Sequence, residues 1–146
     1  MMLIAMINVK NLLLLAILAI IAVSCARFLT RSGSKQESRV NSWNNVGVEQ
    51  FQNLIADPDV QLLDVRTREE FDGGHIAGAI LVDVNEDGFV EKAMAVLDKQ
   101  RPVAVYCRSG RRSARAASQL AAQGMMVTNM EGGVIAWQDA GKSLVK

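Results

Sequence analysis

The 146-residue chain contains only two cysteines, two prolines and one histidine, and its charges nearly balance. Two cysteines cannot form the dense disulfide framework of a small secreted scaffold. Sixteen basic residues against 15 acidic ones leave a formal net charge of +1, which argues against a nucleic-acid or a strongly acidic partner. No internal repeat is present. These absences leave one ordinary domain preceded by an unusual N-terminus.

The N-terminus carries an unbroken apolar run from Leu12 to Val23, preceded by Lys10. A membrane-spanning helix needs about 20 apolar residues, so this run is short for a span. A charged segment, an apolar core and small residues after it are typical of a signal peptide. Met1, Met2 and Met6 are all candidate start residues, with Met6 giving the more ordinary charged segment.

The apolar run ends in Ala22-Val23-Ser24-Cys25-Ala26, which resembles a bacterial lipobox. We therefore predict a signal peptide at residues 1–24, a lipid anchor on Cys25 and a location on the periplasmic side of the cell envelope. Two alternatives stay open. Cleavage after Ala26 would release a soluble exported protein, and an uncleaved segment from Leu12 to Leu29 would act as a membrane anchor.

Residues 27–42 are almost entirely polar, and so little apolar surface cannot offset the entropy of ordering. We predict a flexible tether over residues 25–42 and a folded domain over residues 43–146, long enough for one modest core. If Cys25 is lipidated or removed, Cys107 has no intramolecular partner. In an exported protein this favours a reactive thiol over a disulfide.

Within the domain, short apolar runs alternate with helical patterns. Helices are predicted at 48–56, 67–71, 89–97, 113–123 and 134–138, and strands at 60–65, 79–84, 103–106 and 125–129. Thr67, followed three residues later by Glu70, predicts a capping box. The alternation predicts an α/β fold with a mostly parallel sheet and helices on both faces. Ligands of such sheets bind beyond the carboxyl ends of the strands, where Asp64 and Cys107 stand.

Cys107 opens a loop between a predicted strand and a predicted helix. The loop continues through Arg108, Ser109, Gly110, Arg111, Arg112 and Ser113. Backbone N–H groups in such a loop attract anions, and the same field lowers a thiol pKa from about 8.5 to roughly 3.5–7.5. Arginines at the start of a helix oppose its dipole, and a bound anion would relieve that conflict. The pattern predicts a cysteine nucleophile with an anionic substrate, the alternative being an inert buried thiol beside a solvated basic turn.

Four segments carry a resemblance to a known family. They are Leu62-Leu63-Asp64-Val65-Arg66-Thr67-Arg68-Glu69-Glu70-Phe71, Gly74-His75-Ile76-Ala77-Gly78-Ala79-Ile80, Tyr106-Cys107-Arg108-Ser109-Gly110-Arg111-Arg112-Ser113 and Glu131-Gly132-Gly133-Val134-Ile135-Ala136-Trp137. In this order, over roughly residues 43–143, they resemble a rhodanese domain. The resemblance implies a rhodanese-like α/β fold, a five-stranded parallel sheet flanked by helices on both faces.

The same resemblance implies thiosulfate sulfurtransferase activity. The Cys107 thiolate would take the outer sulfur of thiosulfate as a persulfide and pass it to a thiophilic acceptor such as cyanide or a thiol, with no metal or organic cofactor. Related phosphatases and arsenate reductases carry an arginine six positions after the cysteine, where this chain has Ser113. The shorter loop from Cys107 to Arg112 suits a persulfide sulfur and is too small for a phosphate.

The remaining site residues have expected roles in binding or support. The amides from Arg108 to Ser113 would hold the persulfide, and Arg108, Arg111 and Arg112 would bind the sulfite end of thiosulfate. Asp64 would accept hydrogen bonds from Arg66 or from loop amides, and His75 would fix the loop that follows Gly74.

Two glycines and several apolar residues are also assigned. Gly132 and Gly133 would allow close approach to the Cys107 loop. Trp137 would lie in the core, and Trp43 either in the core or over an edge of the domain. The methionines Met125, Met126 and Met130 would pack on the sheet rather than bind metal.

Two other functions remain open. In the first, Cys107 exchanges persulfide with one specific protein as a sulfur-relay or redox partner. In the second, the domain is a non-catalytic interaction module, and the presence of Cys107 counts against that.

Overall fold

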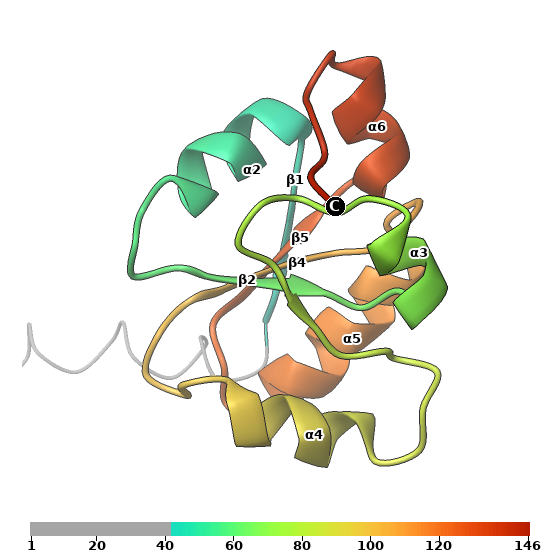
Figure 1. The fold of residues 1–146 in the computed structure, drawn as a ribbon. Coiled ribbons are helices and arrows are strands. Elements are labelled where there is room, and N and C mark those ends of the chain that lie inside the picture. The colour runs from blue at the N-terminus through green and yellow to red at the C-terminus, as the bar shows by residue number, and fades with distance from the viewer. Residues whose placement is uncertain (1–41) are drawn as a thin grey trace, which may run out of the picture. The chain divides into compact units, whose positions relative to one another are not determined.

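The computed structural model describes residues 42–146, in which strands and helices alternate along the chain (Figure 1). The strands are β1 (Asn44–Val46), β2 (Gln61–Asp64), β3 (Ile80–Leu81), β4 (Val103–Tyr106) and β5 (Val127–Met130). The helices are α2 (Val48–Ile55), α3 (Arg68–Asp72), α4 (Phe89–Val96), α5 (Arg111–Ala122) and α6 (Gly133–Asp139). The predicted signal peptide, the lipidation site Cys25 and nearly all of the predicted tether lie outside the described residues.

All five strands form one parallel sheet in the order β1-β5-β4-β2-β3. The five-stranded parallel sheet expected from the sequence is therefore confirmed. Strand β1 escaped the residue-level prediction because it has three residues, begins with two exposed asparagines and pairs only with β5 at the edge. In the described part of the chain, no helix combines the length and apolar character that crossing a membrane requires.

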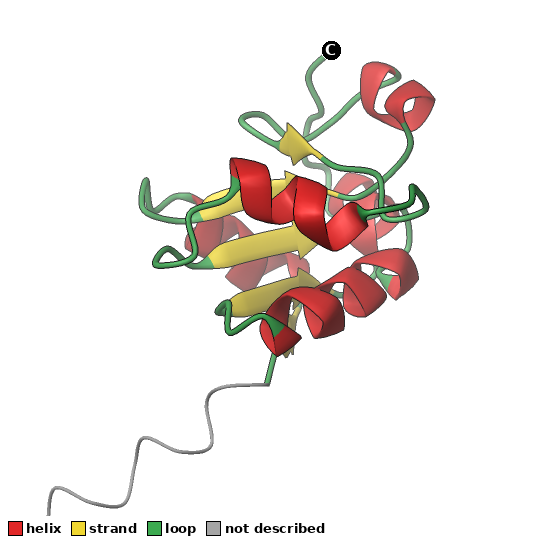
Figure 2. Ribbon diagram, turned by 90° about the horizontal axis from the view of Figure 1, so that it is seen from below, coloured by secondary structure: helices red, strands yellow, loops and turns green. Residues whose placement is uncertain are grey.

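The sheet is covered on both faces, as the two ribbon views show (Figures 1 and 2). Successive residues of a strand point to opposite faces, and β4 follows this rule with an apolar residue at every position. Val103 and Val105 pack with α4 and α5, whereas Ala104 and Tyr106 pack with α2 and α6. Both sides of β4 are thus buried, which fixes the position of the residue that follows it, Cys107.

Each of the longer helices turns apolar side chains toward the sheet. Phe51 of α2 and Ala93 of α4 are fully buried, and Trp137 of α6 lies in the core as predicted. Trp43 is partly buried against the cluster beneath α4 and α5. The methionine prediction was partly wrong: Met125 and Met130 are buried, but Met126 is 56% exposed. It lies just before β5 and belongs to neither buried cluster.

The element ends differ from prediction by a few residues, with two differences that matter. Helix α5 begins at Arg111 rather than Ser113, because Gly110 takes a left-handed conformation (φ 87°) and starts the helix early. Strand β3 is short, although Val82 and Val84 beyond it still donate hydrogen bonds to the Asp64 and Val65 carbonyl oxygens. The capping box is confirmed, since Thr67 and Glu70 exchange both expected hydrogen bonds at 3.2 and 3.3 Å.

Candidate active site

Cys107 lies directly after β4, at the carboxyl edge of the sheet. Asp64, the last residue of the neighbouring strand β2, is in register with Tyr106. The parallel pairing therefore brings both sequence-predicted positions to the same edge, as the topology rule expects. The loop from Arg108 to Gly110 connects this edge to α5.

The Cys107 thiol is fully buried and surrounded by hydrogen-bond donors. The Gly110 N–H donates to Sγ at 3.2 Å, and the Ser113 hydroxyl donates to Sγ at 3.3 Å. Burial by itself would raise the pKa of Cys107. Hydrogen bonds from the Ser113 hydroxyl and from the amides of Ser113, Ser109 and Gly110 outweigh burial and lower it below the ordinary thiol value. The loop therefore favours a thiolate at a position with no exposed surface.

Helix α6 holds the other side of the loop. The Val134 N–H donates to the Cys107 carbonyl oxygen at 2.9 Å, and the Ile135 N–H donates to the Arg108 carbonyl oxygen at 3.1 Å. This contact needs Gly133, because a Cβ there would collide with the Cys107 carbonyl oxygen and stand 2.6 Å from the Arg108 carbonyl group. The close approach predicted for the Gly132-Gly133 pair is thus confirmed.

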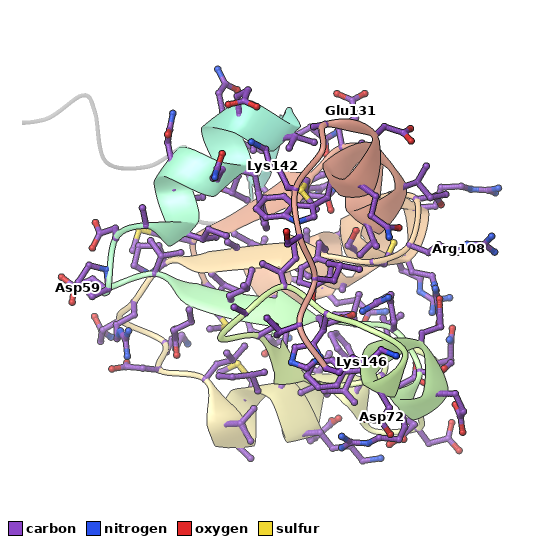
Figure 3. All side chains as sticks on the ribbon, turned by 45° about the horizontal axis from the view of Figure 1, so that its top comes forward. Asp59, Asp72, Arg108, Glu131, Lys142 and Lys146 are labelled. Atoms are coloured by element: carbon purple, nitrogen blue, oxygen red, sulfur yellow. The ribbon has the colours of Figure 1, made fainter. Side chains whose placement is uncertain are left out.

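The arginines of the loop have different surroundings. Arg108 and Arg111 are exposed, and Figure 3 shows Arg108 reaching out from the body of the domain. Arg112 is half-buried and binds Glu70 through two hydrogen bonds, at 2.7 and 2.8 Å. The Arg112 guanidinium lowers the pKa of Glu70 to about 2, mainly through this hydrogen bonding and against the effect of burial. An anionic donor would have to share Arg112 with Glu70.

A buried polar cluster supports the site from below. Arg66 binds Asp64 in a fork, with its Nη2 at 2.6 Å from Oδ2, and the same Nη2 donates to the Gly74 carbonyl oxygen at 2.8 Å. The Arg66 backbone N–H also donates to Asp64 Oδ1 at 3.0 Å. The Tyr106 hydroxyl accepts from the Ile76 N–H at 3.0 Å, and burial together with Asp64 raises the Tyr106 pKa. The cluster joins the ends of β2 and β4 to the segment after α3.

His75 lies beside this polar cluster and is not part of the Cys107 loop. Its ring stacks on Phe71 with the centroids 3.7 Å apart, and its Nδ1 is 3.1 Å from the Phe71 carbonyl oxygen. Its backbone pairs with Val145 near the C-terminus. These contacts are those of a residue that fixes the Gly74 loop.

Two hollows flank the loop and share no lining residue. The first, which we call the arginine hollow, has a volume of about 390 Å³ and is lined by Ser109, Arg111, Arg112 and Arg115. The second, which we call the α3–α6 groove, has a volume of about 370 Å³, and its lining includes Arg66, Glu69, Glu70, Arg108, Ile135 and Leu144. The ion pair between Arg112 and Glu70 joins the two, since each hollow contains one of its members.

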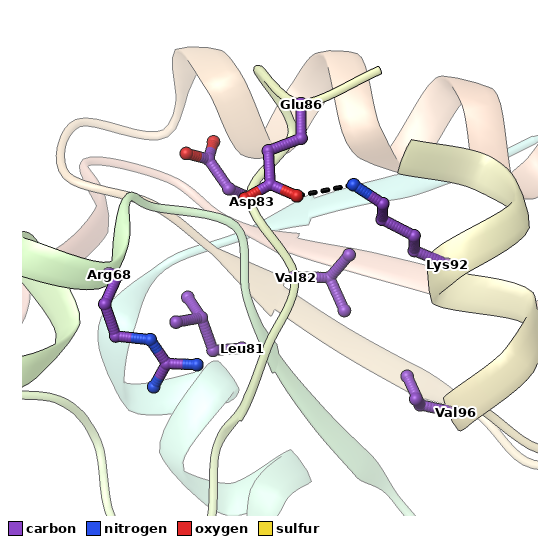
Figure 4. Close-up of a pocket in the computed structure, with 7 residues that line it drawn as sticks. All are labelled: Arg68, Leu81, Val82, Asp83, Glu86, Lys92 and Val96. Carbon is purple, nitrogen blue, oxygen red and sulfur yellow. Dashed lines mark hydrogen bonds and ion pairs between the residues drawn. The ribbon is translucent and has the colours of Figure 1, made fainter. Parts of the chain in front are cut away.

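A third hollow, of about 240 Å³, lies between Arg68 of α3, the segment after β3, and α4 (Figure 4). The Lys92 ammonium and the Glu86 carboxylate pair there at 2.6 Å. None of the loop residues from Cys107 to Ser113 lines it. Among the described residues, no cluster of histidine, cysteine and carboxylate side chains has the arrangement of a metal site.

Comparison with known proteins identifies the family. The family model of the rhodanese-like domain matches residues 47–140. The chain belongs to the rhodanese family. It is 36% identical to a sulfurtransferase of Allochromatium vinosum over 104 residues, which cover 70% of this chain and 94% of that protein. It is 34% identical to a thiosulfate sulfurtransferase of Shewanella oneidensis over 103 residues, covering 69% and 98% of the two chains.

Solved rhodanese structures share the fold. A rhodanese-like domain protein from Staphylococcus aureus superimposes with a TM-score of 0.60 at 30% identity, covering 70% of this chain and 99% of that one. A rhodanese-related protein from Thermoplasma volcanium gives a TM-score of 0.62 at 27% identity, covering 70% and 97%. The resemblance drawn from the four segments is confirmed.

Sequence reasoning missed two features of this rhodanese site. It assigned Glu70 to the capping box alone, but the same carboxylate also holds Arg112. It also missed that the amides of Val134 and Ile135 bind the loop carbonyl groups. Nothing in the sequence around Glu70 indicates that its carboxylate binds Arg112, which is 42 positions away. The glycine pair did signal close approach, though not the hydrogen bonds that follow it.

The first prediction concerns Gly133. Gly133→Ala should reduce the free energy of unfolding by at least about 2 kcal/mol, because the left-handed conformation (φ +59°) and the collision with the Cys107 carbonyl oxygen both oppose a side chain. Gly141→Ala is the matched control, since its φ is +74° and no atom lies within 4 Å of the added Cβ. Urea unfolding measures both. Equal losses in the two variants would show that the collision contributes nothing.

The second prediction concerns the ion pair. Arg112 lowers the pKa of Glu70 from 4.5 to about 2, so the pair stabilises the fold above about pH 4.5 and loses this effect as pH falls toward 2. At pH 7, Glu70→Gln should cost about 1 kcal/mol, since both partners are partly exposed. The difference between wild type and variant should shrink below pH 4.5. Urea unfolding at pH 7 and pH 3 tests this, with the exposed Glu91→Gln as control; a difference independent of pH would contradict it.

Proposed function

We propose that the protein is a sulfurtransferase that carries sulfur as a persulfide on Cys107, from thiosulfate to a thiophilic acceptor such as a thiol or cyanide. The main support for this proposal is that the Gly110 N–H and the Ser113 hydroxyl bind Cys107 Sγ in a loop flanked by arginines. Membership of the rhodanese family and relatives named as sulfurtransferases support sulfur transfer in general. Thiosulfate as the donor is supported by the basic character of the arginine hollow.

In the first half-reaction, the Cys107 thiolate attacks the outer sulfur of thiosulfate. A new sulfur–sulfur bond forms to Cys107, the original one breaks, and its electron pair leaves with sulfite. Arg111 is then available for the sulfite oxygens, because Arg112 is shared with Glu70 and the Arg115 guanidinium donates to the Val84 carbonyl oxygen at 3.1 Å. Arg108, which the sequence also predicted to bind the sulfite end, lines the other hollow. Donors fixed in advance around the sulfur would then hold the charge of the persulfide.

In the second half-reaction, the persulfide anion first takes a proton from water, and an acceptor thiolate then attacks its outer sulfur. The acceptor leaves as a persulfide that keeps the proton, and the bonding pair returns to Cys107 as the thiolate. Neither half-reaction needs a metal or an organic cofactor.

Access to the sulfur sets a condition on both steps. Cys107 has no exposed area, whereas Arg108 and Ser109 beside it are exposed. Reaction therefore requires a local movement that exposes Sγ. Burial alone would also suit an inert thiol, and the lowered pKa is what favours a nucleophile.

The third prediction tests the nucleophile. Reduced protein incubated with thiosulfate should gain one sulfur atom on Cys107, and cyanide should remove it, as intact-mass measurement would show. Cys107→Ser should gain none and keep its fold, because a hydroxyl is close in size to a thiol but a far poorer nucleophile. Cys25→Ser is the matched control and should load like the wild type. A folded, reduced protein that gains no sulfur would overturn the proposed function.

We also propose that the protein is exported and anchored by a lipid on Cys25, at the periplasmic side of the cell envelope. The support is the short apolar run and the small residues around Cys25. One acyl chain binds a membrane only marginally, so stable attachment requires several.

The fourth prediction tests this location. A fatty-acid analogue should label the full-length wild type in the membrane fraction of a bacterium, and Cys25→Ala should remove the label. An unlabelled wild type retained in the membrane would point to an uncleaved anchor. An unlabelled soluble protein outside the cytoplasm would point to cleavage after Ala26.

A further inference from the structure

The two hollows beside the Cys107 loop differ in charge. Three of the four residues that line the arginine hollow are arginines, and no carboxylate lines it. That surface suits a small dianion such as thiosulfate. The α3–α6 groove has charges of both signs, so it suits a different kind of molecule.

Most charges of the α3–α6 groove are already paired. Arg66 binds Asp64 and the Gly74 carbonyl oxygen, and Glu70 binds Arg112. Glu69 and Arg108 remain, both exposed and neither in an ion pair within the described residues. The groove therefore offers one available carboxylate and one available guanidinium, a combination that complements a zwitterion and gives a dianion no net attraction.

The groove also has an apolar surface close to the nucleophile. Ile135 is 44% exposed, and Val134 and Leu144 line the groove beside it. The Ile135 N–H binds the Arg108 carbonyl oxygen, and the Val134 N–H binds that of Cys107 itself. The wall of the groove is thus fixed to the backbone of the reactive residue. Its volume of about 370 Å³ falls in the range of small-molecule sites, about 300–1,000 Å³.

We infer that the α3–α6 groove is the acceptor site, and that its ligand is a short peptide-like thiol carrying both an ammonium and a carboxylate group. Glu69 binds the ammonium, Arg108 binds the carboxylate, and Ile135 contacts the apolar stem. This inference rests on the proposed sulfurtransferase function and adds a division of the site: the donor binds on the arginine side and the acceptor on the side of α6.

The acceptor step is the second half-reaction, with the bound peptide as the acceptor. The thiolate of the bound peptide attacks the outer sulfur of the Cys107 persulfide, and the bond between the two persulfide sulfurs breaks toward Cys107. The peptide leaves as its persulfide. Sulfite leaves on the other side of the loop in the earlier step, so donor product and acceptor need not compete for one surface.

The experiment separates the two half-reactions. Full-length protein is loaded with thiosulfate, freed of the donor, and discharged with glutathione, with N-acetylglutathione, which lacks the ammonium, or with glutathione diethyl ester, which lacks the carboxylates. Dithiothreitol is the neutral comparison, and all thiols are compared at equal thiolate concentration. Glutathione should show the lowest half-saturating concentration.

The variants assign each charge. Glu69→Gln should raise the half-saturating concentration of glutathione about fivefold and leave that of N-acetylglutathione unchanged. Arg108→Gln should do the same for glutathione and leave the diethyl ester unchanged. Glu91→Gln, on the exposed face of α4, is the matched control and should change neither. Arg111→Ala should slow loading by thiosulfate and leave discharge unaltered.

Several outcomes would overturn the inference. One is that glutathione, N-acetylglutathione and the diethyl ester have the same half-saturating concentration. Another is that Glu69→Gln and Arg108→Gln affect all three thiols alike. The third is that the persulfide is discharged only by a cysteine of a protein acceptor. In each case the persulfide still forms, so the proposed function stands. Failure to form any persulfide would instead overturn the proposed function itself.

Discussion

The site depends on the two hydrogen bonds that the first turn of α6 donates to the carbonyl oxygens of Cys107 and Arg108. With these two oxygens bound to α6, the N–H groups of Ser109, Gly110 and Ser113 turn toward the sulfur. Gly133 makes the arrangement sterically available. The position of Cys107 at the end of a strand buried on both faces supplies the remaining constraint. The thiolate site is thus built from main-chain groups together with the Ser113 hydroxyl.

Burial and hydrogen bonding act in opposite directions on the pKa of the Cys107 thiol, and this explains the composition of the loop. Removing a thiolate from water is costly, and the loop offsets that cost chiefly with hydrogen bonds from the Ser113 hydroxyl and from loop amides. The arginine nearest in the chain to Ser113, Arg112, is directed to Glu70 instead. Fixed neutral donors can stabilise a sulfur anion both before and after it gains a sulfur atom. The cations stand outside, where a substrate anion would arrive.

The sequence predicted most of this fold because its local signals agree with the tertiary structure. The apolar run of β4 predicted that strand to the residue, and the Thr67–Glu70 spacing predicted the capping box. Strand β1 could not be predicted, since its polar residues pair only through β5, more than eighty positions away. The ion pair of Arg112 with Glu70 could not be predicted either. Two arginines at the start of a helix are as consistent with binding a free anion as with pairing to a carboxylate of the protein.

Because the sheet is parallel, all strands start on one side of the domain and end on the other. Because β1 runs parallel to its neighbour β5, the described chain begins at the edge where every strand starts. Cys107 and both hollows beside its loop belong to the edge where the strands end. Ser42, where the described chain begins, therefore lies at the opposite ends of the strands from the thiol. Small molecules that react with the thiol could therefore approach it from the side of the sheet opposite to the start of the described chain.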